Sequence, residues 1–292
     1  MMMKKLKKFL CVTGLAVCMA LSMTACSTAG EDDGAVSLES LEELEEEAEE
    51  KAEGSEEEVA TEDEDFSEDG LSTEMTDTIR WFNATYAILT ELNGFDTEYF
   101  GGMATNDMNA MISQASLEES WGVTDRATAD ETMEWLLTEG HRTGFKDNMA
   151  DLADAGIDSV EADGRADFIY NTYEVGESEA QFLADMYGYY EEYGESAIDA
   201  WDYCRAMSLA AFYYHAGYYT ETEALNKSME IAEMIQPLYT SWDEAMNSYL
   251  LGYEYWAEES SDERREIYED LKQEDDSLYN IDWNLAFEKT WE

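Results

Sequence analysis

Four polar residues in the middle of the chain have the types and the spacing to form a charged site. His141 and Arg142 directly follow Gly140, at the expected end of a helix. Asp202 and Arg205 are three residues apart in a helical segment, so they share a face, with the acid on the N-terminal side. In a pocket, His141 could shuttle a proton, Asp202 could orient its ring, and the two arginines could clamp an anion.

The same residues also fit a structural role. Buried together, the two pairs could fix the register of the helices that carry them and satisfy carbonyl groups at the end of the preceding helix. The sequence leaves both roles open. Trp121, Glu119 and Asp125 complete the candidate polar site, and no residue is assigned as catalytic.

Other kinds of chemistry find little support in the sequence. Only two histidines, His141 and His215, are present, which is too few for a His-rich zinc site, and HExxH does not occur. The segment Ser159 to Tyr170 resembles an EF-hand loop, but its first and last residues cannot supply the required ligands. GxSxG, P-loop and GxGxxG motifs are also missing, so we expect no metal and no cofactor. We expect Cys204 to be a buried, inert thiol.

The candidate residues belong to blocks that are spread along the chain. These blocks are LEESWGVTDR (117–126), WLLTEGHR (135–142) with Phe145, AWDYCR (200–205), AGY (216–218), EA (223–224), SW (241–242), and Tyr249 and Gly252 before YW (255–256). Together they resemble the DUF1266 family, a domain of unknown function, over about residues 115–258. The resemblance implies an all-helical domain and implies no activity.

The composition of residues 76–292 indicates one acidic domain. This part holds 48 acidic residues against 11 lysines and arginines. Such a balance argues against nucleic acid, whose binding depends on Lys and Arg contacts to phosphate, and against adhesion to anionic lipid. A chain of this length is sufficient for one domain with a sizeable core.

The pattern of this part is helical throughout. Pro237 is the only proline, and no stretch alternates strictly as a strand would. Capping boxes are predicted at Thr220 and Ser241, and glycines stand at expected helix ends at positions 94, 122, 140, 156 and 217. The predicted helices are 74–93, 105–119, 125–139, 145–155, 165–173, 178–192, 195–216, 221–239, 242–258 and 261–273.

The longest apolar face lies in the helix predicted over 195–216. Its members follow a three-four spacing, namely Ile198, Trp201, Ala206, Leu209, Phe212 and Tyr213. We therefore predict an all-α fold, a single compact domain of about ten helices over 74–292, with 195–216 at its centre. The many tyrosines and tryptophans favour core packing, and a sugar-stacking platform is the alternative.

The N-terminus resembles a bacterial lipoprotein signal. Lys4, Lys5, Lys7 and Lys8 precede an apolar run over 9–20 that is too short to cross a bilayer, and a lipobox, Met-Thr-Ala-Cys, ends at Cys26. The resemblance implies a signal peptide over 1–25, cleavage before Cys26 and a diacylglyceryl group on its sulfur. We therefore expect an extracytoplasmic protein, anchored by this lipid to the bacterial cell membrane.

An acidic segment over 26–73 follows the signal. Residues 27–75 contain 22 acidic residues and one lysine, and they have too few apolar residues to offset the entropy of ordering. We predict a disordered tether, stretched by like-charge repulsion. After cleavage and acylation only Cys204 would keep a thiol, so no internal disulfide is expected.

Two functions are consistent with these observations. The first is a noncatalytic module of the cell envelope that binds a protein, a peptide or a glycan. The second is an extracytoplasmic hydrolase that uses His141 with a carboxylate such as Glu119 or Asp202, beside Arg205. The distinction is geometric, because an open cleft at these residues would favour the enzyme and a buried, fully hydrogen-bonded cluster would favour the module.

Overall fold

The computed structural model describes residues 71–292, which form a single helical domain without a β-strand. The all-helical prediction is therefore confirmed for this part of the chain. The predicted signal, Cys26 and most of the tether lie outside the described residues. The helices are α2 (Asp77–Leu92), α3 (Asp107–Trp121), α4 (Arg126–Thr138), α5 (Gly140–Ala155), α6 (Arg165–Thr172), α7 (Glu177–Tyr193), α8 (Asp199–His215), α9 (Glu221–Ile235), α10 (Trp242–Ala257) and α11 (Asp262–Leu271).

Local sequence signals mark several helix ends correctly. Thr220 and Glu223 form the predicted reciprocal capping box at the start of α9. At α10, Ser241 accepts from the N–H of Glu244, but the Glu244 carboxylate bonds to Thr240 instead of returning to Ser241, so that box is only half formed. The glycines expected at helix ends, 94, 122, 140, 156 and 217, all have positive φ.

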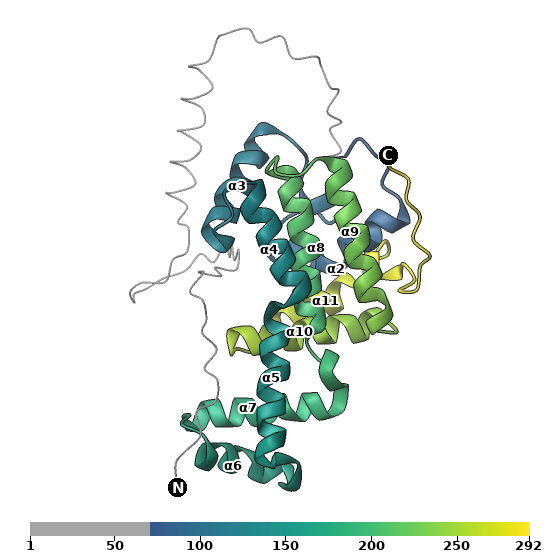
Figure 1. Cartoon of the computed structure of the whole chain (residues 1–292). Helices are drawn as coiled ribbons and strands as arrows, with labels where there is room; N and C mark the ends of the chain where they lie inside the picture. Colours follow the sequence, from purple (N-terminus) through teal and green to yellow (C-terminus); the bar gives the residue numbers. More distant parts are fainter. Residues whose placement is uncertain (1–70) are drawn as a thin grey trace, which may run out of the picture.

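Helix α8 is the central element of the fold (Figure 1). Every one of its residues except Tyr214 is buried, and helices α2, α3, α4, α5, α9 and α10 all pack against it. The helix begins at Asp199 rather than at residue 195, because Gly194–Ser196 forms a separate 3-10 turn. None of the described helices combines the length and apolarity that a membrane span requires.

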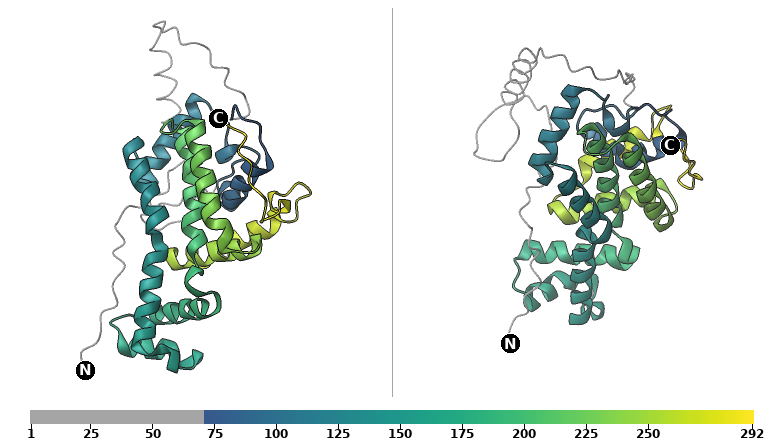
Figure 2. Two further views of the ribbon diagram at one scale, coloured as in Figure 1. Left: turned by 45° about the vertical axis from the view of Figure 1, so that its right-hand side comes forward. Right: turned by 45° about the horizontal axis from the view of Figure 1, so that its top comes forward.

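The buried apolar residues fall into two clusters. The larger core joins α2, α3, α4, α9, α11 and most of α8 and α10. The smaller core joins α5, α6, α7 and the residues that precede α8, together with Leu251 and Tyr255 from the end of α10. Figures 1 and 2 show the corresponding shape, in which α6 and α7 form one end of the molecule and α5 leads to them.

The two cores meet where α4 gives way to α5. Gly140 stands at this joint with φ of +61°, in the left-handed region that glycine adopts without steric cost. A Cβ atom at this position would overlap the Asp202 carboxylate of α8. Helix α5 therefore starts at Gly140, five residues before the predicted start at 145, because the left-handed residue redirects the chain without ending its helical course.

The C-terminal segment after α11 is largely non-helical, yet it completes the larger core. Trp283 packs against Trp81 and Trp242, with ring centroids 5.0 and 4.7 Å apart. Its indole N–H donates to the carbonyls of Gln236 and Tyr239. Sequence periodicity gives no sign of this role, because the contacts join positions far apart in the chain.

The first described residues also belong to the folded domain. Leu71 is buried, and Ser72 and Thr73 donate to the Glu221 carboxylate at distances of 2.5–3.0 Å. The predicted tether over 26–73 thus includes Leu71, which is buried in the larger core, and two residues that are bonded to the start of α9. Glu221 combines this anchor with its position in the first turn of α9, where a negative charge is favourable.

The close contact between α8 and α10 at Gly252 gives a test of the packing. A Cβ atom on Gly252 of α10 would overlap Cβ of Trp201 in α8 and lie 2.8 Å from its Cγ. We expect Gly252→Ala to lower the free energy of unfolding by about 2–3 kcal/mol, because the two helices must separate. Gly188→Ala in α7 is the matched control, since nothing lies within 4 Å of its Cβ position. It should raise stability by about 0.5–1 kcal/mol, and urea denaturation of both variants would check the contrast.

Candidate functional site

The Asp202 carboxylate is the centre of the polar cluster. Its side chain is 0% exposed. Oδ2 accepts from the backbone N–H of Arg142 at 2.9 Å, and Oδ1 accepts from Nη2 of Arg205 at 2.6 Å. The first bond joins the start of α5 to the first turn of α8, and the second lies within α8. His141, Arg142, Asp202 and Arg205, which were predicted from sequence to form one site, therefore meet in space.

Arg142 connects the carboxylate to the end of α4. Its Nη1 lies 3.3 Å from Oδ2 of Asp202, and its two terminal nitrogens donate to the carbonyls of Leu136 and Leu137 at 2.5 and 2.6 Å. Carbonyl groups in the last turn of a helix lack intrahelical partners. Arg142 thus caps α4 with a positive charge while it neutralises an acid of α8, and its guanidinium stacks on the ring of Tyr203.

His141 and Arg205 close the opposite side of the carboxylate. Nδ1 of His141 lies 2.8 Å from Nη2 of Arg205 and 3.3 Å from Oδ1 of Asp202. A guanidinium group can only donate, so the shorter contact requires Nδ1 to accept. We therefore assign the ring proton to Nε2. His141 is then neutral, and its Nδ1 lone pair accepts from Arg205.

Aromatic rings pack against the side chains of Arg205 and His141. The guanidinium of Arg205 lies 4.3 Å from the ring of Trp201 and 5.4 Å from that of Trp121. Trp135 packs edge-on against the His141 ring at 5.2 Å. Trp121 is thus beside the cluster, as predicted. The exposed fractions of the His141, Arg142 and Arg205 side chains are 14%, 7% and 9%, so no open cleft exposes the carboxylate.

The environment shifts two pKa values in the cluster. Burial lowers the pKa of His141 below 6.5, and the charge of Arg205 lowers it further, against the partial opposing effect of Asp202. Burial alone would raise the pKa of Asp202, but the charge of Arg205 and the N–H of Arg142 lower it below its usual value. At neutral pH the cluster therefore holds one carboxylate, two guanidinium groups and an uncharged imidazole.

A second ion pair extends the polar layer along the same two helices. Nζ of Lys146 in α5 lies 3.1 Å from the carboxylate of Asp199 in α8, whose side chain is 7% exposed. Burial raises the pKa of Asp199, and the Lys146 charge opposes that rise. The sequence analysis missed this pair, although Arg142 and Lys146 are four residues apart on one helical face and Asp199 precedes Asp202 by three.

The other predicted site residues lie apart from the cluster. Asp125 is the N-cap of α4, where its exposed carboxylate accepts from the N–H of Thr128. Those local bonds lower its pKa. Glu119 is exposed on α3, and none of the hydrogen bonds or ion pairs described for residues 71–292 joins it to Asp202. Both residues were expected in the candidate polar site, and neither belongs to the buried cluster.

The remaining candidate groups are also enclosed. Cys204 is a buried free thiol, and burial raises its pKa. Nε2 of His215 donates to the carbonyl of Phe100 at 2.7 Å, and burial lowers the pKa of this histidine too. Within residues 71–292 no group of three His, Cys, Asp or Glu side chains is arranged to hold a metal ion.

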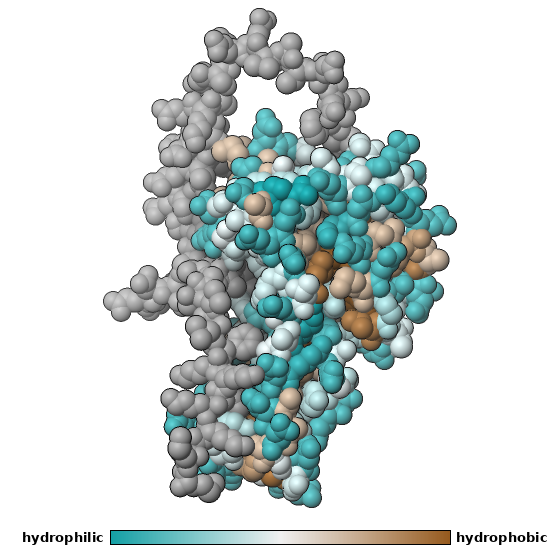
Figure 3. Space-filling model, viewed as in Figure 1, coloured by the Kyte–Doolittle hydropathy of each residue, from teal (hydrophilic) through white to brown (hydrophobic). Residues whose placement is uncertain are grey.

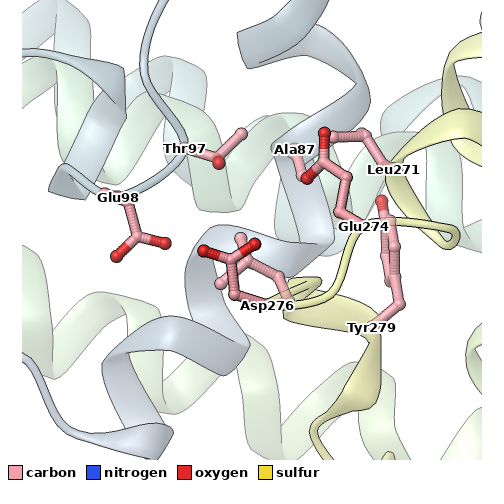
Figure 4. A pocket seen from close by; sticks show the side chains of 8 residues that line it. Ala87, Thr97, Glu98, Leu271, Glu274, Asp276 and Tyr279 are labelled. Atoms are coloured by element: carbon pink, nitrogen blue, oxygen red, sulfur yellow. The ribbon is translucent and has the colours of Figure 1, made fainter.

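An open depression lies elsewhere, between α2 and the C-terminal segment (Figure 4). Its empty volume is about 440 Å³, and its walls include Glu98, Glu274, Asp276 and Tyr279. Arg80 lies beside it, 3.6 Å from Glu98. Partial burial raises the pKa of Glu274, and neighbouring acids raise it further. This depression contains neither a nucleophile–base pair nor a residue of the polar cluster.

The fold and the buried ion cluster define an all-helical domain whose two cores are joined by a polar layer. A model of a family described as a protein of unknown function, DUF1266, matches residues 116–283, over half of the chain. The chain belongs to this family. The match extends beyond the expected limit of residue 258 and includes Trp283, which the structure places in the larger core. No curated protein and no solved structure matches the chain.

The cluster should behave as one energetic unit. Asp202→Ala should lower the free energy of unfolding by about 3–5 kcal/mol, because two buried guanidinium groups lose their counter-charge. Asp202→Ala combined with Arg205→Ala should cost less than the sum of the single effects. Glu230→Ala is the matched control, since it breaks an exposed ion pair with Lys227, and it should cost under about 1 kcal/mol. Urea denaturation would test this, and strict additivity would contradict a coupled cluster.

The two lowered histidine pKa values predict a loss of stability in mild acid. As the pH falls through 6.5, the histidines of the unfolded chain bind protons, whereas those of the folded chain stay neutral to a lower pH. The contribution of the two neutral histidines to the free energy of unfolding is therefore complete above pH 6.5 and declines below it. The difference in the free energy of unfolding between wild type and His141→Gln should therefore shrink as the pH falls from about one unit above 6.5 to about one unit below it. His215→Gln should show the same trend. A difference that grows on acidification would show that His141 is charged in the folded state.

Proposed function

We propose that this protein is an extracytoplasmic lipoprotein, tethered to the cell membrane through a lipid on Cys26, whose helical domain is a noncatalytic binding module of the cell envelope. Its partner would be an envelope protein, a peptide or a glycan. The signal sequence, the lipobox and the acidic tether support the location. The enclosed polar cluster supports the noncatalytic role.

The closure of the cluster is the observation that carries this proposal. A general base needs a lone pair within reach of the proton that it removes. The Nδ1 lone pair of His141 is occupied by Arg205, and Asp202 has no exposed surface. In addition, no side-chain nitrogen or oxygen of these residues or of Arg142 is among the buried atoms that lack a partner. Such a cluster stabilises a fold and leaves no group to attack a substrate.

The hydrolase alternative has one observation in its favour. His141 retains 14% side-chain exposure, so its ring is the part of the cluster nearest to solvent. A substrate would have to displace Arg205 from Nδ1 and leave that guanidinium without one of its acceptors. Removing a partner from a buried charge costs several kcal/mol, which makes the alternative the weaker of the two.

Charge limits the class of partner. The acidic residues of 76–292 outnumber the lysines and arginines by 37. A surface of this sign repels nucleic acid and anionic lipid headgroups and attracts cationic groups. A neutral glycan or a basic segment of an envelope protein therefore suits the module best.

Capture from the protein's own membranes would test the proposal. The tagged full-length chain and its His141→Ala form should recover the same partner after mild crosslinking, because His141 acts within the fold.

Cys26→Ala should accumulate as a longer precursor without acyl label and without membrane retention. Unchanged labelling and fractionation of Cys26→Ala would exclude the lipid anchor. If wild type cleaves envelope material and a folded His141→Ala form does not, the hydrolase alternative is established instead.

A further inference from the structure

Helix α3 directs three of its large apolar side chains away from the domain. Met108, Met111 and Ile112 are 46%, 41% and 38% exposed. Their spacing of three and four residues places them on one helical face with exposed Ala115. These four residues are called the α3 face below. The buried residues of α3 are Ser113, Leu117 and Ser120, so two of the three are small and polar. A helix that serves only to cover a core has the opposite arrangement.

The helix is well anchored on its other sides. Asn106 caps its N-terminus by accepting from the N–H of Asn109, and Gly122 ends it in the left-handed conformation. Nε2 of Gln114 donates to the carbonyl of Ala216 at 2.8 Å, which ties α3 to the end of α8. Figures 1 and 2 show α3 at the edge of the bundle. The α3 face is therefore held in place on a formed helix rather than on a loose segment.

Acidic residues surround the α3 face. Asp107 precedes it, Glu118 lies two turns beyond Met111, and Glu119 lies two turns beyond Ile112, so all three share its side of the helix. All three are exposed. No lysine or arginine occurs in the sequence between Arg80 and Arg126. The surface in Figure 3 is mainly hydrophilic, with separate apolar areas between the hydrophilic ones.

We propose that the α3 face docks a cationic amphipathic helix of a partner protein. The apolar side of that helix would cover Met108, Met111 and Ile112, and its lysines or arginines would lie against Asp107, Glu118 and Glu119. Methionine side chains are flexible and polarizable, so they adapt to a ligand helix, and helix-in-groove recognition commonly uses such anchors. This inference rests on the proposed binding function and specifies the chemistry of its partner.

Charge separates this occupant from the alternatives. The segment of this chain with Leu38, Leu41 and Leu44 has apolar residues at helical spacing, but acids surround them. A second copy would bring the acids of one α3 against those of another. Each alternative places like charges together across an apolar contact, which is unfavourable, whereas a basic helix neutralises them.

Peptide titration against the full-length chain would test the assignment. Four labelled peptides are compared by fluorescence anisotropy in a non-ionic detergent. They are a Leu/Lys amphipathic helix of about 18 residues, long enough to match α3, the same composition scrambled, the same helix with Glu for Lys, and a peptide of residues 37–54. We expect only the Leu/Lys helix to bind well, with an affinity that falls as salt rises.

Variants then locate the contact. Met108→Gln, Met111→Gln and Ile112→Gln together should weaken binding of the Leu/Lys helix by about tenfold or more, because its apolar anchors are lost. Leu238→Gln is the matched control, since Leu238 is 39% exposed at another surface. It should leave the affinity within about twofold.

Glu118→Gln with Glu119→Gln should reduce both the affinity and its salt dependence. Circular dichroism checks the helical fold, and Met111→Gln alone serves if the triple variant fails to fold.

Several results would overturn the assignment. Equal binding by the triple variant and wild type would show that α3 is not the contact, and equal binding of the scrambled peptide would show attraction by net charge only. Tighter binding of the 37–54 peptide would make the chain's own acidic segment the occupant. A wild-type dimer that the triple variant lacks would make it a second copy. If wild type and the triple variant recover the same membrane partner, the proposed binding function is retained and only the assignment of the α3 face as its contact is rejected.

Discussion

The burial of the Asp202 carboxylate is the constraint on which the domain depends. A carboxylate without exposed surface is tolerated only when donors surround it, because its desolvation costs several kcal/mol. The backbone N–H of Arg142 and the guanidinium of Arg205 supply those donors, and Gly140 leaves the space that the carboxylate occupies. Since these groups come from the α4–α5 joint and from α8, the two cores can meet in only one register.

This arrangement changes the meaning of the sequence blocks that relate the chain to its family. The blocks WLLTEGHR and AWDYCR contain the whole buried cluster, and LEESWGVTDR supplies Trp121 and the N-cap Asp125. Histidine, aspartate and arginine at these positions suggest catalysis when they are considered singly. In the structure they contact one another, so the resemblance describes how helices are joined and does not identify a reaction.

Much of this architecture could be predicted because it is encoded locally. Glycine at helix ends, the capping box at Thr220 and the apolar spacing around Trp201 each depend on neighbours in the chain. The meeting of His141 with Asp202 was predictable because few charges lie on the most apolar helix. The role of Trp283, the Lys146–Asp199 pair and the outward face of α3 depend on which surfaces meet across the fold, and a single sequence does not specify that.

The anchoring of residues 72 and 73 on Glu221 has a mechanical consequence. A pull that reaches the domain through Leu71 enters at the first turn of α9, where Thr222 also bonds to the final residue, Glu292. Residues 72 and 73 and the C-terminal Glu292 thus attach to the same turn of α9. Tension applied there would pass into α9 and the larger core. Helices α6 and α7 belong to the smaller core and lie outside that path.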